Sequence, residues 1–488
     1  MKCTSKEKLL EELNNMLSDG KLKLADIKVF FSDYADVQFL PNKHNPSIGA
    51  FYCEGMVDTV QLNDYLNLIF DNMDKSKMLR RNGEEDDLPP THYLSQMNKV
   101  VESLFSGYLL IYKEGRGSIH GVDIAKIPQR PPSESNAEVS LKGPKDGFTE
   151  EIHTNISLIR KRIKTPDLYN ESFVLGSISK TKVSLLYLKN KANMEMITEA
   201  RHRLSSFEGE CVISSGQLEQ WISDRTFSLF PLYDSISRPD FTIECLFRGR
   251  FIIIVDGSPM VLIGPINLFE LIKSPEDVHF PYHIIAFQRI FRFIGLIIAV
   301  FLPGFWIAIA SVNIDQIPFT LLATVVEGRK GLPLPITFEF IFILGLFELL
   351  KEAGIRMPKA VGQTVAIVGG LVIGDASIRA GLASPTLLVV VAITAVASYT
   401  LVNQSLSGTV SILRIYILLV SSYLGVYGFV LSAISIVVYL SKLESFKMAY
   451  LEPLASLSFN QFLSALLINP FKRRDLSTSM FKKGRGKI

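Results

Sequence analysis

Polar and apolar positions divide the 488-residue chain into a mixed front and an apolar back. In the front, apolar residues recur at helical or alternating intervals among charged ones, which is typical of water-soluble folds. The opening segment has the helical interval, with apolar residues at Leu9, Leu10, Leu13 and Met16. Between residues 293 and 440 long apolar runs replace this pattern, and only 13 of these residues are charged. The pattern predicts a soluble region followed by an α-helical integral membrane bundle.

Residues 1–126 are expected to form a first α/β module. Strand-like apolar runs follow the opening helix at residues 26–31 and 48–57. Residues 127–147 then concentrate Pro and Gly, which indicates a linker or a long exposed loop. This composition separates the first module from the chain that follows it.

Residues 148–283 are expected to form a second α/β module. A helix is predicted from Thr149, and strands are predicted at residues 183–188 and 251–255. The Asp-Gly-Ser-Pro sequence at 256–259 indicates a tight turn before the next apolar run. Helix and strand patterns alternate loosely, so the order of the strands stays open.

The transmembrane domain is placed at residues 284–441, with about four spans. The predicted spans are residues 294–314, 332–350, 384–402 and 412–440. A further apolar element at 360–374 would reach about 22 Å as a helix, which is shorter than the ~30 Å hydrocarbon core. This length favours a re-entrant or pore helix over a full span.

Positive charges predict the orientation of the bundle. Lys and Arg precede the first span and follow the second and fourth, and the basic tail at 442–488 falls on the same side. The positive-inside rule makes this side the cytoplasm, so a multi-pass cell-membrane protein with both termini cytoplasmic is expected. Arg329, Lys330 and Arg414 oppose this arrangement. The tail is attributed to the membrane and its lipid, and no nucleic-acid partner is expected.

Motifs of enzymes and metal sites do not occur in the sequence. There is no Walker-type phosphate loop, no HExxH zinc motif and no GxSxG nucleophile elbow. The four cysteines are far apart and lack the spacing of metal ligands. We therefore expect no catalytic residues, no metal site and no cofactor, and a protein that is not an enzyme.

Small residues recur in the fourth predicted span at intervals of four and three positions. They are Ser421, Gly425, Gly428, Ser432 and Ser435. In one continuous helix they share a face, and small side chains on such a face let helix backbones approach closely. Packing within one subunit and contact between subunits both fit this spacing.

The apolar element at 360–374 has two distinct faces. Valines form one face, and small residues form the other: Val361, Val365, Val368 and Val372, against Gly362, Ala366, Gly369 and Gly370. The small face can pack on neighbouring helices while the valine face constricts a pore by dewetting. A buried re-entrant helix without a pore fits the spacing equally well.

Four acidic residues in or beside the apolar segments are functional candidates, because ionisable groups are costly in a membrane. They are Glu339, Glu348, Glu352 and Asp375. Glu348 and Glu352 share a helical face at i, i+4, and Glu339 points the other way. A structural alternative pairs Glu348 and Glu352 with Lys351 or Arg356 at the membrane interface.

Several long stretches resemble the A subunits of bacterial spore germinant receptors, the GerA family. The stretches are residues 143–168, 237–240, 255–265, 274–280, 347–385 and 389–400. Among them, FELLKEAGIRMPKAVGQTVAIVGGLVIGDASIRAGLASP is the longest. The resemblance extends from about residue 100 to 455, and residues 1–95 are less diagnostic.

The resemblance implies a channel rather than an enzyme. Such A subunits look like oligomeric channels in the inner membrane of the dormant spore, beside a transporter-like B subunit and a lipoprotein C subunit. Nutrient recognition by the B subunit opens the assembly, and monovalent cations leave the spore. The match carries the pore over to Pro358–Asp375 of this sequence. A related component of the dipicolinate-release system is the alternative within the family.

Two other classes of membrane protein remain alternatives. A secondary transporter would show an internal repeat with two broken helices in matching positions, and the sequence has one interrupted element, at 360–374. A signalling scaffold without a pore would tolerate bulky residues on the valine face, whereas a channel would not.

Overall fold

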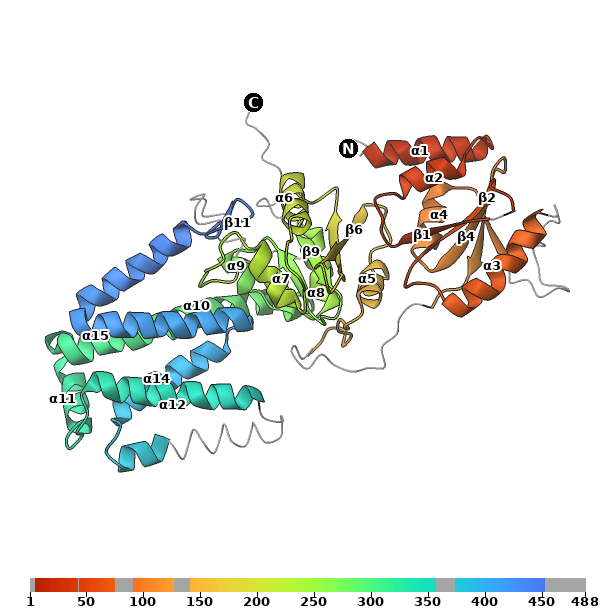
Figure 1. Ribbon diagram of the computed structural model, residues 1–488. Helices are drawn as coiled ribbons and strands as arrows, with labels where there is room; N and C mark the ends of the chain where they lie inside the picture. The colour runs from red at the N-terminus through yellow and green to blue at the C-terminus, as the bar shows by residue number, and fades with distance from the viewer. Residues whose placement is uncertain (1–4, 43, 75–90, 127–140, 357–373, 453–488) are drawn as a thin grey trace. The chain divides into compact units, whose positions relative to one another are not determined.

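The computed structural model describes residues 5–42, 44–74, 91–126, 141–356 and 374–452 (Figure 1). The chain forms two compact units. Among the described residues, the N-terminal unit contains the chain up to Thr226 and Tyr233–Pro265, and the helical unit contains Phe227–Leu232 and the chain from Ile266 to Glu452. Each unit is described separately below.

The first module of the N-terminal unit is a five-stranded antiparallel sheet with helices on both faces. Its strands are β1 (Val37–Pro41), β2 (Ile48–Cys53), β3 (Thr91–Leu94), β4 (Tyr108–Lys113) and β5 (Ile119–Asp123), in the order β1-β2-β4-β5-β3. Its helices are α1 (Ser5–Ser18), α2 (Leu24–Phe30), α3 (Thr59–Asp74) and α4 (Met97–Leu104). Figure 1 shows α1, α2 and α4 on one face of the sheet and α3 on the other. A separate hydrophobic core lies under each face.

Two local predictions for this module are wrong. In the predicted strand 26–31, residues 26–30 belong instead to helix α2 and Phe31 is its C-cap residue, because Asp26 accepts a hydrogen bond from the Lys23 backbone N–H (3.1 Å) and stabilises the first turn. The opening helix exists as expected, but Leu9 and Met16 are exposed by 38% and 43%. The buried stripe of α1 is instead Leu10, Leu13 and Leu17.

The second module is also a five-stranded antiparallel sheet flanked by helices. Its strands are β6 (Leu168–Leu175), β7 (Thr181–Leu188), β8 (Asp234–Ile236), β9 (Phe251–Val255) and β10 (Val261–Gly264), in the order β6-β7-β9-β10-β8. Its helices are α5 (Ile152–Arg160), α6 (Met194–Ser205), α7 (Ser215–Ile222) and α8 (Pro239–Phe247). Strands β7 and β9 confirm the predicted runs, and all five residues of β9 are buried.

A buried ion pair joins the two modules within the N-terminal unit. Arg160 at the end of α5 donates from Nε to Asp36 Oδ2 (2.9 Å), and both side chains are almost completely buried. The Arg160 guanidinium also lies 4.0 Å from the centre of the Phe105 ring. Asn170 donates a further hydrogen bond to Asp36 (3.2 Å). Because both charges are compensated, this contact holds the modules together without an unpaired buried ion.

The helical unit is a bundle of apolar helices. It contains α9 (Leu268–Leu271), α10 (Tyr282–Ile307), α11 (Phe319–Gly328), α12 (Ile336–Arg356), α14 (Pro385–Tyr399), α15 (Gln404–Ser441) and a hairpin of β11 (Glu444–Ser445) with β12 (Met448–Ala449). Among the described residues, the segments Tyr282–Val312 and Gln404–Ser441 are long and apolar enough to cross a membrane. Helix α14 has 15 residues and reaches about 22 Å, less than a hydrocarbon core.

Helix α15 is not the single continuous span that the sequence predicts. Gly425 has φ 59° and ψ −142°, a conformation that breaks the helix and that favours glycine. We call residues 404–424 the first arm and residues 426–441 the second arm. Figure 1 shows the two arms as separate rods that meet at an angle. A hydrogen bond between the Tyr416 and Ser435 hydroxyl groups (3.0 Å) links the arms.

Candidate functional site

Three charged residues of α12 bind two neighbouring helices, and we call them the seam: Glu339, Glu348 and Lys351. Glu339 is completely buried, and its Oε1 accepts hydrogen bonds from the Ser384 backbone N–H (2.5 Å) and hydroxyl (2.6 Å). Ser384 is the N-cap residue of α14. A carboxylate therefore caps α14 from another helix, where the partial positive charge of the helix N-terminus favours it. This contact fixes the start of α14 against the start of α12.

Arg329 provides the second partner of Glu339. Arg329 Nε lies 3.7 Å from Glu339 Oε2, which is an ion pair but too long for a hydrogen bond. Among the described residues, neither of these two buried atoms has a hydrogen-bond partner. The charge of the carboxylate is thus balanced by Coulomb attraction, while Oε1 carries its hydrogen bonds.

The C-terminal half of α12 is bound to the first arm of α15. Glu348 Oε1 accepts hydrogen bonds from Arg414 (2.7 Å) and from the Ser411 hydroxyl (2.9 Å). One turn away, Lys351 donates to the Ser407 hydroxyl (2.9 Å). The Arg414 side chain is only 3% exposed, so Glu348 compensates a buried charge.

This arrangement corrects the pairing expected for Glu348. The sequence alternative paired it with Lys351 or Arg356 on its own helix, but its partner is Arg414, on α15. The predicted topology places Arg414 on the outer side of the membrane, as a charge that opposes the positive-inside rule. Glu352, one turn after Glu348, is exposed.

The predicted pore element follows α12 directly. Its valines and glycines lie outside the described residues: Val361, Val365, Val368, Val372, Gly362, Gly369 and Gly370. Asp375 is described, and residues 374–379 are helical. It pairs with Arg379 (2.8 Å), and both side chains are more than half exposed, so this ion pair contributes little stability.

The small residues of α15 are divided between its two arms. Ser421 lies on the first arm, Gly428 and Ser432 lie on the second, and Gly425 lies at the break. All four are buried within the chain, and Ser435 is half-buried. The expectation of one continuous face is therefore wrong, because positive φ at Gly425 turns the second arm away from the axis of the first.

Asn313 supports the break in α15. It follows a π-helical turn, Ala308–Val312, at the end of α10. Its Oδ1 accepts a hydrogen bond from the Val426 backbone N–H (2.9 Å), which the break leaves without a helical partner. Backbone breaks in membrane helices need such a polar partner. Sequence reasoning missed Asn313, although an Asn at the end of a long apolar run was an available signal.

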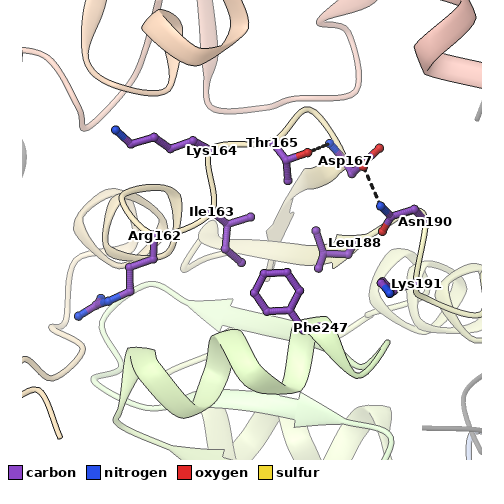
Figure 2. A pocket seen from close by; sticks show the side chains of 9 residues that line it. All are labelled: Arg162, Ile163, Lys164, Thr165, Asp167, Leu188, Asn190, Lys191 and Phe247. Carbon is purple, nitrogen blue, oxygen red and sulfur yellow. Dashed lines mark hydrogen bonds between the residues drawn. The ribbon is translucent and has the colours of Figure 1, made fainter. Parts of the chain in front are cut away.

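A cavity of about 350 Å³ opens on the second module (Figure 2). Figure 2 shows an apolar floor with the Phe247 ring beside Ile163 and Leu188. Thr165, Asp167 and Asn190 form its polar wall. The described residues contain no cluster of His, Cys, Asp or Glu suited to a metal ion.

 

The polar groups of this cavity hydrogen-bond one another. The Asp167 backbone N–H donates to the Thr165 hydroxyl oxygen (3.3 Å), and the Asn190 side-chain amide donates to Asp167 Oδ2 (2.7 Å). Both bonds are drawn in Figure 2. Since these polar groups already bond one another, the seam on α12 is the stronger candidate site.

Among the carboxyl groups of the N-terminal unit with shifted pKa values, Asp36 and Glu219 shift in opposite directions. Burial alone would raise the pKa of Asp36, but the Arg160 charge and the hydrogen bonds from Arg160 and Asn170 outweigh it and lower the pKa. Burial, together with the nearby Asp234 charge, raises the pKa of Glu219 to about 7. Asp36 is therefore a structural anion, whereas Glu219 titrates near neutral pH.

Fold and site together define a class of protein. Two mixed helix–sheet modules precede apolar helices, and two of these helices are long enough to cross a membrane. Carboxylates on α12 bind an arginine and a helix N-terminus inside the helical unit. The chain is a membrane protein with apolar C-terminal helices and a mixed N-terminal unit.

Comparison with known proteins gives the family. Residues 25–478 match the family described as Bacillus/Clostridium GerA spore germination protein. The chain belongs to the GerA family of spore germination proteins, the A subunits of germinant receptors.

Individual relatives cover most of the chain. Spore germination protein XA of Bacillus anthracis is 39% identical over 461 residues, which are 92% of this chain and 93% of that protein. The uncharacterized membrane protein YfkQ of Bacillus subtilis (strain 168) is 30% identical over 440 residues, 89% of this chain and 85% of that protein. A crystal structure of the N-terminal domain of the A subunit of the Bacillus megaterium spore germinant receptor GerK3 is 30% identical, with a TM-score of 0.35, and covers 50% of this chain and 94% of that one.

Proposed function

We propose that this chain is the channel-forming A subunit of a spore germinant receptor. It assembles as a homo-oligomer in the inner membrane of the spore, with its N- and C-termini in the cytoplasm. A transporter-like B subunit senses the nutrient, a lipoprotein C subunit completes the receptor, and monovalent cations leave through the A subunits. The chain performs no enzymatic step.

The observation that carries this proposal is the anchoring of α12 and α14 on either side of the predicted pore element. Glu348 fixes the C-terminal half of α12 to α15, and Glu339 fixes the start of α14. The chain between these helices contains the sequence 360–374, with its valine face. A pore-lining element needs flanks of this kind, because a constriction that dewets depends on side chains held at a fixed separation.

A secondary transporter is a second candidate, and the break at Gly425 favours it. Broken helices are typical of transporter binding sites. However, Asn313 accepts a hydrogen bond from the backbone N–H that the break at Gly425 leaves free, and the small residues around the break are buried. The sequence also lacks the internal repeat that usually accompanies such pairs of broken helices.

The proposal is tested by enlarging the valine face. Val365→Trp and Val368→Trp are introduced into the full chain in spores, together with its partner subunits, and release of potassium and sodium is measured after addition of nutrient. We expect either substitution to change cation release at unchanged protein level. The matched control is Val389→Trp, on the exposed face of α14, which is 58% exposed. Wild-type cation release in both pore variants would contradict the channel and support the scaffold.

A further inference from the structure

The short helix α11, Phe319–Gly328, connects α10 to α12 inside the helical unit. Its ten residues reach about 15 Å, which is too short to cross a hydrocarbon core. The apolar segment Tyr282–Val312 ends just before it, and the polar residues Asn313, Asp315 and Gln316 follow that segment. Figure 1 shows α11 crosswise between the end of α10 and the start of α12. A spanning segment that ends in polar residues indicates that α11 lies at the level of the lipid headgroups.

A cavity of about 340 Å³ lies against one face of α11. That face presents an apolar stripe at helical spacing, Leu322, Val325 and Val326, and Arg329 continues it at the C-terminal end of the helix. The rest of the lining comes from the end of α10, the turn after it and the residue after Arg329: Ala310, Ile314, Ile317 and Lys330. Small-molecule cavities typically measure about 300–1,000 Å³ and combine apolar walls with a few polar groups, as this cavity does.

The Arg329 guanidinium is held in place on one side and open on the other. Its Nη2 donates a hydrogen bond to the Leu334 carbonyl (3.3 Å), and its Nε lies 3.7 Å from Glu339 Oε2. Among the described residues, its Nη1 has no hydrogen-bond partner, and the side chain is 27% exposed. A guanidinium that is already fixed loses little freedom when its open side binds an anion, and its fork of donors matches phosphate.

The carboxylates that contact Arg329 and Lys330 leave both cations available to a further anion. Glu339 directs its hydrogen-bonding oxygen at Ser384, so it meets Arg329 through Coulomb attraction alone. Glu327 pairs with Lys330 (2.5 Å), but both side chains are largely exposed, so this pair is weak and Lys330 can turn toward the cavity. The mouth of the cavity therefore offers one fixed and one movable positive charge.

We propose that this cavity binds a phospholipid, with the phosphodiester at Arg329 and an acyl chain along the apolar stripe of α11. The basic end of the cavity lies at headgroup level, where lipid phosphates lie, and the apolar lining suits the chain attached to such a phosphate. A water-soluble phosphate compound would leave this apolar lining unoccupied, so the chemistry favours a lipid. This inference requires neither ion conduction nor a known nutrient.

The test measures phospholipid bound to the full chain. The protein is purified in detergent, washed to remove loosely bound lipid, mixed with dioleoyl phosphatidylglycerol and examined by native mass spectrometry. Competition samples contain dioleoylglycerol, which has the chains without the phosphate, or glycerol phosphate, which has the phosphate without the chains. We expect phosphatidylglycerol to remain bound to the wild-type chain and neither competitor to displace it.

Two variants remove the two halves of the site independently. Arg329→Gln removes the charged donor, and we expect it to weaken phosphatidylglycerol binding by about tenfold or more, the loss that corresponds to one hydrogen bond to a charged group. Val326→Trp fills the apolar stripe from a position that is 53% exposed, and we expect a loss of similar size. Because Val326→Trp leaves Glu339 and its partners unchanged, it keeps the test decisive even if Arg329→Gln does not fold.

Matched controls make the same chemical changes elsewhere in the helical unit. Arg379→Gln removes an exposed arginine, and Val389→Trp adds a ring to the exposed face of α14, so both should bind phosphatidylglycerol like the wild-type chain. Wild-type binding by Val326→Trp, or displacement of the lipid by glycerol phosphate alone, would overturn the proposal. A changed oligomeric state of Val326→Trp without loss of lipid would also overturn it, because a second copy of the chain would then cover this face. None of these results depends on whether the chain conducts ions.

Discussion

Asn313 Oδ1 accepts a hydrogen bond from the Val426 backbone N–H at 2.9 Å, at the point where α15 breaks. The donor and the acceptor are 113 residues apart in the chain. The contact joins the end of α10 to the joint between the two arms. It also explains how an apolar helix tolerates an interruption, since an unsatisfied N–H in an apolar environment is costly.

Replacing Asn313 should destabilise the helical unit. Asn313→Ala removes the acceptor and leaves the Val426 N–H unpaired, which we expect to lower stability by about 1–3 kcal/mol. Thermal unfolding of the full chain in detergent measures the change. Asn313→Asp keeps an acceptor oxygen and should recover part of the loss. Equal melting temperatures for wild-type and Asn313→Ala would contradict this role.

Gly425 should not tolerate a side chain. A Cβ at this position would lie 2.1 Å from Asn313 Oδ1, and the backbone has positive φ. Gly425→Ala is therefore expected to cost about 1–3 kcal/mol through strain and displacement of Asn313. Gly408→Ala is the matched control on the same helix, because nothing lies within 4 Å of its added Cβ. The same unfolding assay should show Gly408→Ala as neutral or stabilising.

The pair of Glu348 and Arg414 should behave as one unit. Glu348→Gln leaves the Arg414 charge buried, so we expect a loss of about 2–3 kcal/mol. The double variant Glu348→Gln with Arg414→Leu should recover much of that loss, because no unpaired charge remains. Asp375→Asn removes an exposed ion pair and should change stability by less than about 1 kcal/mol. If the stability losses of Glu348→Gln and Arg414→Leu, measured singly, add up to the loss of the double variant, the two residues are not coupled.

Because of Glu219, the free energy of unfolding should decrease as pH rises. Its pKa is raised from 4.5 to about 7 in the folded chain, so between these values the folded state binds more protons than the unfolded state. Stability from this group is complete below about pH 4.5 and is lost as pH rises through 7, by at most about 3 kcal/mol. Glu219→Gln should remove this decline and raise the melting temperature at pH 8 more than at pH 5. Glu208→Gln, at an exposed position, is the control; a parallel response of both variants would contradict the assignment.

The sequence predicted the secondary-structure elements better than the pairing of the strands. The two N-terminal modules and strand β9 follow from local patterns, because β9 is a short, fully apolar run beside a turn. The strand orders could not be predicted, since pairs such as β7 with β9 join residues about 70 positions apart. Helix α2 was mistaken for a strand because its seven residues fit both periods.

The candidate site was predicted by residue type and not by partner. Intramembrane carboxylates drew attention to Glu339 and Glu348, but Ser384 and Arg414 are 45 and 66 positions away from them. No spacing rule along one helix reaches such partners. The break at Gly425 was hidden for a similar reason, because a glycine in an apolar run fits a packing face as well as a joint.

The central claim is that the chain forms a cation channel closed at its valine face. The most direct measurement is potassium efflux from cells that express the full chain with Val368→Ala, compared with wild-type and with Val389→Ala on the exposed face of α14. The channel account predicts a leak without nutrient in Val368→Ala alone, because a smaller side chain widens the constriction. No leak from Val368→Ala, with the protein assembled in the membrane, would contradict it.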